Sequence, residues 1–310
     1  MLSIPYTGTQ FKGPLAKFNK SDSLPVKWSE LVWAAITVGK VAGDENAYGI
    51  YSALEKLHRA AMIRAYLKAS GTALIQTKVY EMSDPSEKTS ISFYLGMTLA
   101  KLFAEKLFGV PKLLHFAVYK DNYVIAATQG KSRPDLIGQD LKGKWFVFEA
   151  KGRSNNFDQL ALDKAKEQAK QIVSINTSAP LCRMGSEAFF DAGLCFQMVD
   201  PEHIEGDRSR RIEIDVEEAD RQYYAPLETI LASRDRRISI IVNGKRLLEV
   251  HIPEADLWIG FTDRDASAKL VGRPRTLLPM EYLGGDGVLI RLGESWSDEN
   301  MTLEPHQRSA

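Results

Sequence analysis

The chain has 310 residues, of which 44% are apolar, so it is long enough for more than one domain and its composition argues against wholesale disorder. Its 40 basic and 40 acidic side chains cancel, which excludes a strong overall field for a polyanion and requires any nucleic-acid surface to be locally basic. Two cysteines exclude a disulfide framework, and no apolar run approaches the roughly 20 residues that span a bilayer, so we expect a cytoplasmic protein without a membrane partner.

The first third of the chain, residues 1–85, is expected to be a mainly helical region. Proline and glycine residues interrupt its beginning and predict an irregular start. A helical pattern begins at Trp28, and apolar residues recur at helical spacing over 46–67. Residues 81–87 contain a turn-favouring Asp-Pro pair, which predicts a linker to the middle third.

The middle third, residues 86–200, alternates helical and extended patterns. Apolar residues at helical spacing predict a helix over 89–108 that ends at Gly109. A strand over 144–150 is apolar at four successive positions and should be buried on both faces. The other predicted elements are strands at 113–120 (with a hairpin to 123–127), 135–139 and 193–199, and a helix at 157–173 capped by Asn155 and Asn156.

The last third, residues 201–310, is expected to mix helices and strands. Its clearest signal is Asn243-Gly244 between apolar runs at 238–242 and 247–252, a pair typical of a tight β-hairpin. The polar tail from Ser295 is expected to fray.

Two charged residues end the buried strand of the middle third. Side chains alternate faces along a strand, so Glu149 and Lys151 share one face. Charged groups at the end of such an apolar strand are costly unless partners satisfy them. A hairpin of the length that separates Asp135 from Glu149 can bring their carboxylates together, and converging carboxylates bind hard cations such as Mg²⁺ or Mn²⁺.

Arg133-Pro134-Asp135 followed by Glu149-Ala150-Lys151, between helix–three-strand–helix–strand elements, resembles the PD-(D/E)xK nuclease superfamily. The resemblance implies an α/β protein with a restriction-endonuclease-like αβββαβ core, a mixed central sheet, a helical N-terminal extension and a mixed α+β C-terminal region for substrate or partner recognition. It implies that Asp135, Glu149 and the Ala150 carbonyl hold Mg²⁺ or Mn²⁺. Lys151 would orient the attacking water and stabilise charge on the phosphate.

A glutamine on the following predicted helix extends the resemblance. Gln168 shares a helical stripe with Ala161, Ala165 and Ile172. Many members of the superfamily carry a glutamine on this helix, which implies a catalytic role for Gln168, with Gln171 in reserve. A satisfied boundary residue is the equally weighted alternative. The sequence departs from the family at the first core helix, where Glu105 is the nearest acid and is expected to face solvent.

Positive charge is concentrated around the proposed site. Nine basic and six acidic side chains lie between residues 131 and 171, a balance that suits a phosphate backbone. We expect Arg133, Lys144 and Arg153 to contact nucleic acid because they flank the site. A solvated helix face with interleaved charges accounts well for Lys164, Lys166 and Lys170.

The resemblance thus implies a Mg²⁺-dependent endonuclease, for which DNA is the favoured substrate and RNA the alternative. Fold analogy suggests bacterial defence, restriction or repair. An unrestrained nuclease is toxic, so we expect a homodimer interface or a protein partner to control it. One alternative is a catalytically silent scaffold that binds DNA or a protein. Another is an unrelated α/β protein, which predicts that Asp135 lies far from Glu149.

Overall fold

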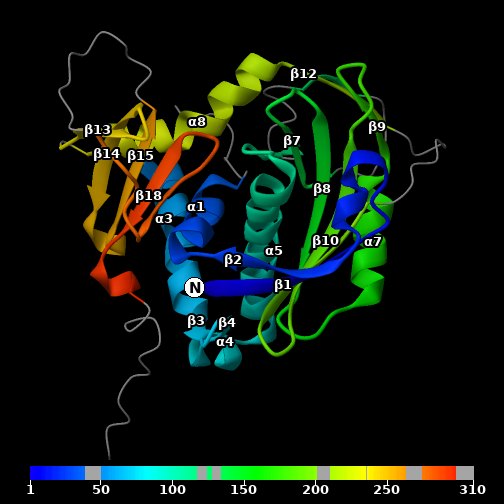
Figure 1. The fold of residues 1–310 in the computed structure, drawn as a ribbon, viewed down its shortest axis with the longest axis horizontal. Helices are drawn as coiled ribbons and strands as arrows, with labels where there is room; N and C mark the ends of the chain where they lie inside the picture. Colours follow the sequence, from blue (N-terminus) through cyan, green and yellow to red (C-terminus); the bar gives the residue numbers. More distant parts are fainter. Residues whose placement is uncertain are drawn as a thin grey trace, which may run out of the picture.

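The computed structural model describes residues 1–38, 50–116, 124–127, 134–200, 210–234, 236–262 and 274–297. Helices cover a mixed central sheet of seven strands, which confirms the α/β class (Figure 1). The strand order is β2-β1-β11-β10-β8-β7-β5. In that order the strands span Ser21–Val26, Leu2–Thr9, Leu194–Val199, Cys182–Phe190, Trp145–Gly152, Leu136–Gln139 and Leu114–His115.

Strand β8 lies inside this sheet and pairs on both sides. It runs antiparallel to β7 and parallel to β10. Its first six residues are buried, as the continuous apolar run predicts for a strand covered on both faces. Only its last two residues, Lys151 and Gly152, are partly exposed. The polar end of β8 therefore reaches the rim of the sheet.

Two helices cover opposite faces of the sheet beside β8 (Figure 1). Helix α5 (Pro85–Phe108) begins with a capping box at Asp84 and ends at Gly109, whose positive φ of 68° completes the predicted stop. Helix α7 (Gln159–Ala169) is shorter than expected. Asp158 caps it, because its carboxylate accepts the Leu160 and Ala161 N–H groups, so the proposed asparagine cap is wrong.

The C-terminal third builds a second sheet of six strands in the order β16-β13-β14-β15-β18-β17. These strands span Pro274–Arg275, Ile238–Val242, Lys245–Ile252, Leu257–Thr262, Val288–Leu292 and Glu281–Leu283. The predicted hairpin joins β13 to β14, and both Asn243 and Gly244 have the positive φ values that its turn requires. Helices α1 (Trp28–Thr37) and α8 (Val216–Ala232) lie on this sheet, and α1 also packs on α5.

The remaining elements are smaller. Helices α3 (Ile50–Tyr66) and α4 (Lys78–Met82) flank the hairpin of β3 (Leu67–Ser70) and β4 (Ala73–Gln76). A three-stranded sheet has the order β6-β12-β9, with bounds Val124–Ala127, Arg210–Ile214 and Ile172–Ile175. Short 3₁₀ turns occupy Gly13–Phe18, Pro253–Ala255 and Glu294–Trp296. Among the described residues, none of the helices is both long and apolar enough to cross a membrane.

Several local predictions are wrong where distant pairing decides the structure. The expected irregular start contains β1 and β2, and β1 pairs with β11 far along the chain. Residues 117–123 of the hairpin predicted between 113–120 and 123–127 lie outside the described residues; of its described parts, β5 pairs with β7 whereas β6 pairs with β12. The last two residues of the predicted helix, Ile172 and Val173, belong to β9 instead. Strand β10, the parallel neighbour of β8, is not among the elements that the sequence predicts.

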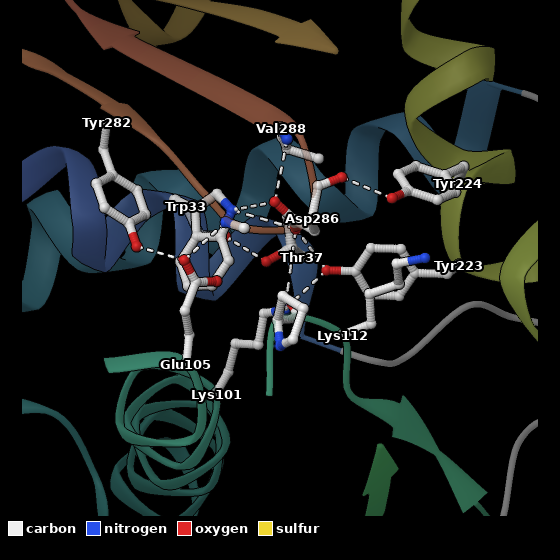
Figure 2. A network of polar contacts seen from close by, with 12 residues as sticks. Trp33, Thr37, Lys101, Glu105, Lys112, Tyr223, Tyr224, Tyr282, Asp286 and Val288 are labelled. Carbon is white, nitrogen blue, oxygen red and sulfur yellow. Dashed lines mark hydrogen bonds and ion pairs between the residues drawn. The ribbon is translucent and has the colours of Figure 1, made fainter. Parts of the chain in front are cut away.

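A buried polar network fastens the C-terminal sheet to α5 (Figure 2). Lys101 of α5 is fully buried and donates to the Tyr223 hydroxyl at 2.7 Å. The Tyr223 hydroxyl donates to the carboxylate of Asp286, also at 2.7 Å, and the indole N–H of Trp33 donates to that carboxylate at 3.0 Å. Lys101 Nζ lies 3.9 Å from Asp286 Oδ2. Three helices, α1, α5 and α8, from three parts of the chain therefore converge on one carboxylate.

Glu105 belongs to this interface and not to the solvent surface. Its Oε1 accepts the Tyr282 hydroxyl at 2.6 Å and the Gly285 N–H at 2.8 Å (Figure 2). The expectation of a solvent-facing residue is wrong, because the C-terminal sheet covers this face of α5. Burial raises the pKa of the Glu105 carboxyl.

Candidate active site

Asp135 and Glu149 meet where β7 begins and β8 ends. The backbone N–H of Asp135 donates to Glu149 Oε2 at 3.1 Å. In return, Asp135 Oδ2 accepts the Ala150 N–H at 3.0 Å. The register of β7 and β8, with Leu136 opposite Phe148, sets this pairing. It disfavours the interpretation of an unrelated α/β protein, which requires the two acids to lie apart.

The Ala150 carbonyl faces the same side of β8 as this pair. The N–H and C=O of one residue leave an extended strand in the same direction, and the Ala150 N–H points to Asp135. Strand β7 begins at Leu136, which lies opposite Phe148. It therefore does not extend alongside Ala150. Two carboxylates and one backbone carbonyl are thus directed to the same rim of the sheet.

Lys151 links Glu149 to helix α7. Its ammonium group lies 2.6 Å from Glu149 Oε1 and 3.0 Å from Gln168 Oε1. The Lys151 side chain is 29% exposed, so part of it faces solvent. The structure therefore brings together Asp135, Glu149, Lys151 and Gln168. The reserve candidate Gln171 lies elsewhere, since its side chain donates to the Glu167 carbonyl at 3.0 Å.

Glu149 is held in an environment that disfavours its charge. The residue is 1% exposed, and burial raises the pKa of its carboxyl to about 7, with the charge of Asp135 as the second cause. Lys151 acts in the opposite direction but does not cancel these effects. A bound cation would reverse the shift of Glu149, because it favours the ionised carboxylate.

The oxygen ligands at this site suit Mg²⁺ or Mn²⁺ better than a structural metal that needs three or more ligating side chains. Among the described residues, no group of three or more His, Cys, Asp or Glu side chains lies in position to hold a metal ion. Magnesium needs no such cage, because it commonly keeps several waters and binds protein through one or two carboxylates. The carboxylates of Asp135 and Glu149 with the Ala150 carbonyl match that requirement.

Glu187 is a buried acid that the sequence pattern did not reveal. It lies on β10 directly opposite Lys151. Its Oε1 accepts the Asp158 N–H at 2.8 Å, while its buried Oε2 has no hydrogen-bond partner among the described residues. Burial raises the pKa of its carboxyl to about 7. Recognising β10 from the apolar residues at its alternate positions would have placed Glu187 beside the site.

The three predicted nucleic-acid contacts have different outcomes. Arg153 directly follows β8, and its guanidinium lies 2.6 Å from the Asp158 carboxylate at the start of α7. Lys144 is exposed but precedes β8, at the opposite end of the strand from Glu149 and Lys151. It therefore does not flank the site as expected. Arg133 lies outside the described residues.

Comparison of the chain with protein-family models, curated proteins and solved structures gave no significant match. The arrangement of side chains at the end of β8 is therefore what bears on function.

Proposed function

We propose that this protein is a metal-dependent nuclease that hydrolyses phosphodiester bonds, with a restriction-endonuclease-like core formed by α5, β5, β7, β8, α7 and β10. The observation that carries the proposal is the reciprocal hydrogen bonding of Asp135 and Glu149 beside Lys151. Two acids and a lysine at the rim of a sheet are a costly arrangement for a purely structural role.

In the proposed reaction, Asp135, Glu149 and the Ala150 carbonyl would hold Mg²⁺ or Mn²⁺. When bound, the cation supplies positive charge that acidifies the attacking water and offsets charge developing on the phosphate. The Lys151 ammonium contacts the Glu149 carboxylate and so would lie beside the metal. From there it can orient the water and stabilise the phosphate oxygens. Gln168 accepts a hydrogen bond from Lys151 and restricts the direction of the ammonium.

We propose DNA as the substrate, with Arg153 as a contact to its backbone. A guanidinium beside the site suits phosphate oxygens, and such contacts position a nucleic acid without reading its sequence. Arg153 is already paired with Asp158, so a phosphate would have to share or replace that carboxylate. A role in defence, restriction or repair is the biological setting that we propose for this activity.

The direct test is cleavage of plasmid and single-stranded DNA with Mg²⁺ or Mn²⁺. We expect the wild type to cut, and Glu149→Ala and Lys151→Ala to lose at least about a hundredfold in rate, because each removes a group that acts on the transition state. Circular dichroism establishes that both variants fold.

A matched control pair lies at the C-terminal end of α7, the helix that carries Gln168. Glu167 and Lys170 form an ion pair at 2.5 Å, and Glu167 is largely exposed. Glu167→Ala and Lys170→Ala should cut like the wild type. If the wild type binds Mn²⁺ and DNA but cuts neither DNA nor RNA, the catalytically silent scaffold replaces this proposal. If the Glu149 and Lys151 variants cut normally, the site is misassigned.

A further inference from the structure

Helix α5 meets the end of β8 at a distance that leaves no room for side chains. A Cβ atom built on Gly152 would lie 1.7 Å from the Ser92 carbonyl oxygen of α5. A Cβ on Gly96 of the same helix would lie 2.6 Å from the Lys151 carbonyl oxygen. Ordinary van der Waals contact begins at 3.4 Å. The backbone of Lys151 is thus packed directly against the helix.

Helix α7 approaches the opposite face of the sheet in the same way. Gly185 of β10 is the partner of Glu149 in the strand register. A Cβ on Gly185 would lie 2.7 Å from the Lys166 backbone nitrogen, and Gln168 follows two residues later on α7. Both helices therefore pack against the site strands at glycine residues. Helix α5 does so on one face of the sheet and α7 on the other.

Space, and not backbone conformation, requires glycine at these positions. Gly96, Gly152 and Gly185 all lack the positive φ that favours glycine over other residues. Alanine could adopt each backbone conformation, but its methyl group would collide with backbone atoms of a helix or strand. Those atoms cannot rotate away as a flexible side chain can, so the two elements must separate.

We propose that Gly96, Gly152 and Gly185 are positioning residues of the site: they set how closely α5 and α7 approach the sheet, and so place Lys151 and Gln168 relative to Glu149. The inference rests on the proposed nuclease function. Gly152 acts through Lys151, its neighbour in the chain. Gly185 acts through α7, which carries Gln168.

The proposal separates the lysine from the metal ligands. Asp135 and Glu149 are fixed by hydrogen bonds across β7 and β8, and the tight contacts of α5 involve Lys151 and Gly152. A methyl group on Gly152 should therefore displace Lys151 while the carboxylates keep their pairing. A displacement of about 1 Å at a reacting group can cost about a hundredfold in rate.

The test compares Gly152→Ala and Gly185→Ala with Gly8→Ala as the matched control. A Cβ on Gly8 of β1 would lie 2.1 Å from the Phe18 carbonyl oxygen, so this variant imposes a similar backbone collision away from the site. We expect Gly152→Ala to lower kcat about a hundredfold, with Mn²⁺ affinity by calorimetry within about threefold of wild type. Gly8→Ala should lose comparable stability in urea and keep its kcat.

A second readout does not need activity. In protein labelled with ¹³C at lysine Cε, the Lys151 resonance is identified by its absence in Lys151→Arg. Gly152→Ala should shift this resonance, and Gly8→Ala should leave it in place. If Gly152→Ala does not fold, Gly96→Ala takes its place, because its closest contact of 2.6 Å is less severe.

An unshifted Lys151 resonance together with an unchanged kcat in a folded Gly152 or Gly96 variant overturns the proposal. Equal loss of kcat in Gly8→Ala also overturns it, since the effect is then general destabilisation. If the wild type does not cut nucleic acid, the nuclease proposal fails, and the Lys151 resonance still decides whether the glycines position that side chain.

Discussion

The backbone N–H of Asp135 donates to the Glu149 carboxylate at 3.1 Å, joining two residues that lie 14 positions apart in the chain. The carboxylate of Asp135 is held in turn by the Ala150 N–H at 3.0 Å. Each acid is thus oriented by the backbone of the opposite strand. Their separation is a property of the β7–β8 pairing, so the pair is in place before any ligand arrives.

Asp135→Asn should separate the charge of this residue from its structural role. An asparagine can still accept the Ala150 N–H through its amide oxygen, so we expect the melting temperature to change little. Loss of one anionic ligand should weaken Mn²⁺ binding by about ten- to a hundredfold, which calorimetry measures. A large loss of stability with unchanged Mn²⁺ affinity would make Asp135 a structural residue only.

Metal binding should depend on pH through Glu149. Its carboxyl pKa is raised from 4.5 to about 7, so the metal-free fold gains stability from the protonated form below pH 4.5 and loses it as pH rises to 7. A metal must displace this proton. We therefore expect Mn²⁺ affinity to rise by up to about tenfold per pH unit below pH 7 and to level off above it.

Glu187 provides the control for this pH dependence, because its pKa is also raised to about 7. Glu187→Gln should alter the pH dependence of stability and leave that of Mn²⁺ affinity intact. Glu149→Gln should abolish the pH dependence of Mn²⁺ affinity together with most of the binding. The reverse pattern would assign the metal to Glu187.

Gln168→Ala should reduce cleavage less than Lys151→Ala does. The variant removes the 3.0 Å hydrogen bond to the Lys151 ammonium but leaves its contact with Glu149 at 2.6 Å. We expect a loss of about ten- to a hundredfold in kcat, as is usual for groups that orient a catalytic side chain. The control is Gln171→Ala, at the reserve candidate, which should cut like the wild type. Equal losses of kcat in the two variants would contradict a specific role for Gln168.

Asp286→Ala should strongly destabilise the fold. Asp286 accepts hydrogen bonds from Trp33, Tyr223 and the Val288 N–H, and is the nearest countercharge to the buried Lys101. Leaving that lysine without its partner should lower the free energy of unfolding by about 3–5 kcal/mol in urea titrations. Glu81→Ala, which breaks the exposed pair with Lys78, should cost at most about 1 kcal/mol.

Lys101 should add its own pH dependence to stability. Burial lowers the pKa of its ammonium from 10.5 to about 8, against the attraction of Asp286. The folded state therefore releases this proton more readily than the unfolded chain, so stability should rise as pH increases from 8 to 10.5. Lys101→Met should abolish this rise. A slope that persists in the variant would point to another group.

Much of the candidate site can be predicted from the local sequence pattern. The two-residue period of a strand places Glu149 and Lys151 on one face whatever the rest of the chain does. The apolar run at 145–148 identified β8 as a strand buried on both faces, and Asn243-Gly244 identified the hairpin of β13 and β14. The same spacing argument places Lys144 at the far end of β8, so that expectation could have been corrected from the sequence.

Only the tertiary structure decided which distant segments meet. Three features depend on contacts between residues far apart in the chain. They are the pairing of β1 with β11, the position of β10 beside β8, and the burial of Glu105 under the C-terminal sheet. The close packing at Gly152 likewise depends on a helix that begins 67 residues earlier at Pro85. The periodicity of apolar residues shows which face of a helix or strand is apolar, but many different elements could pack on such a face. Packing of the whole chain selects among them, because it decides which combination of partners fills the core closely and pairs most of the buried polar groups.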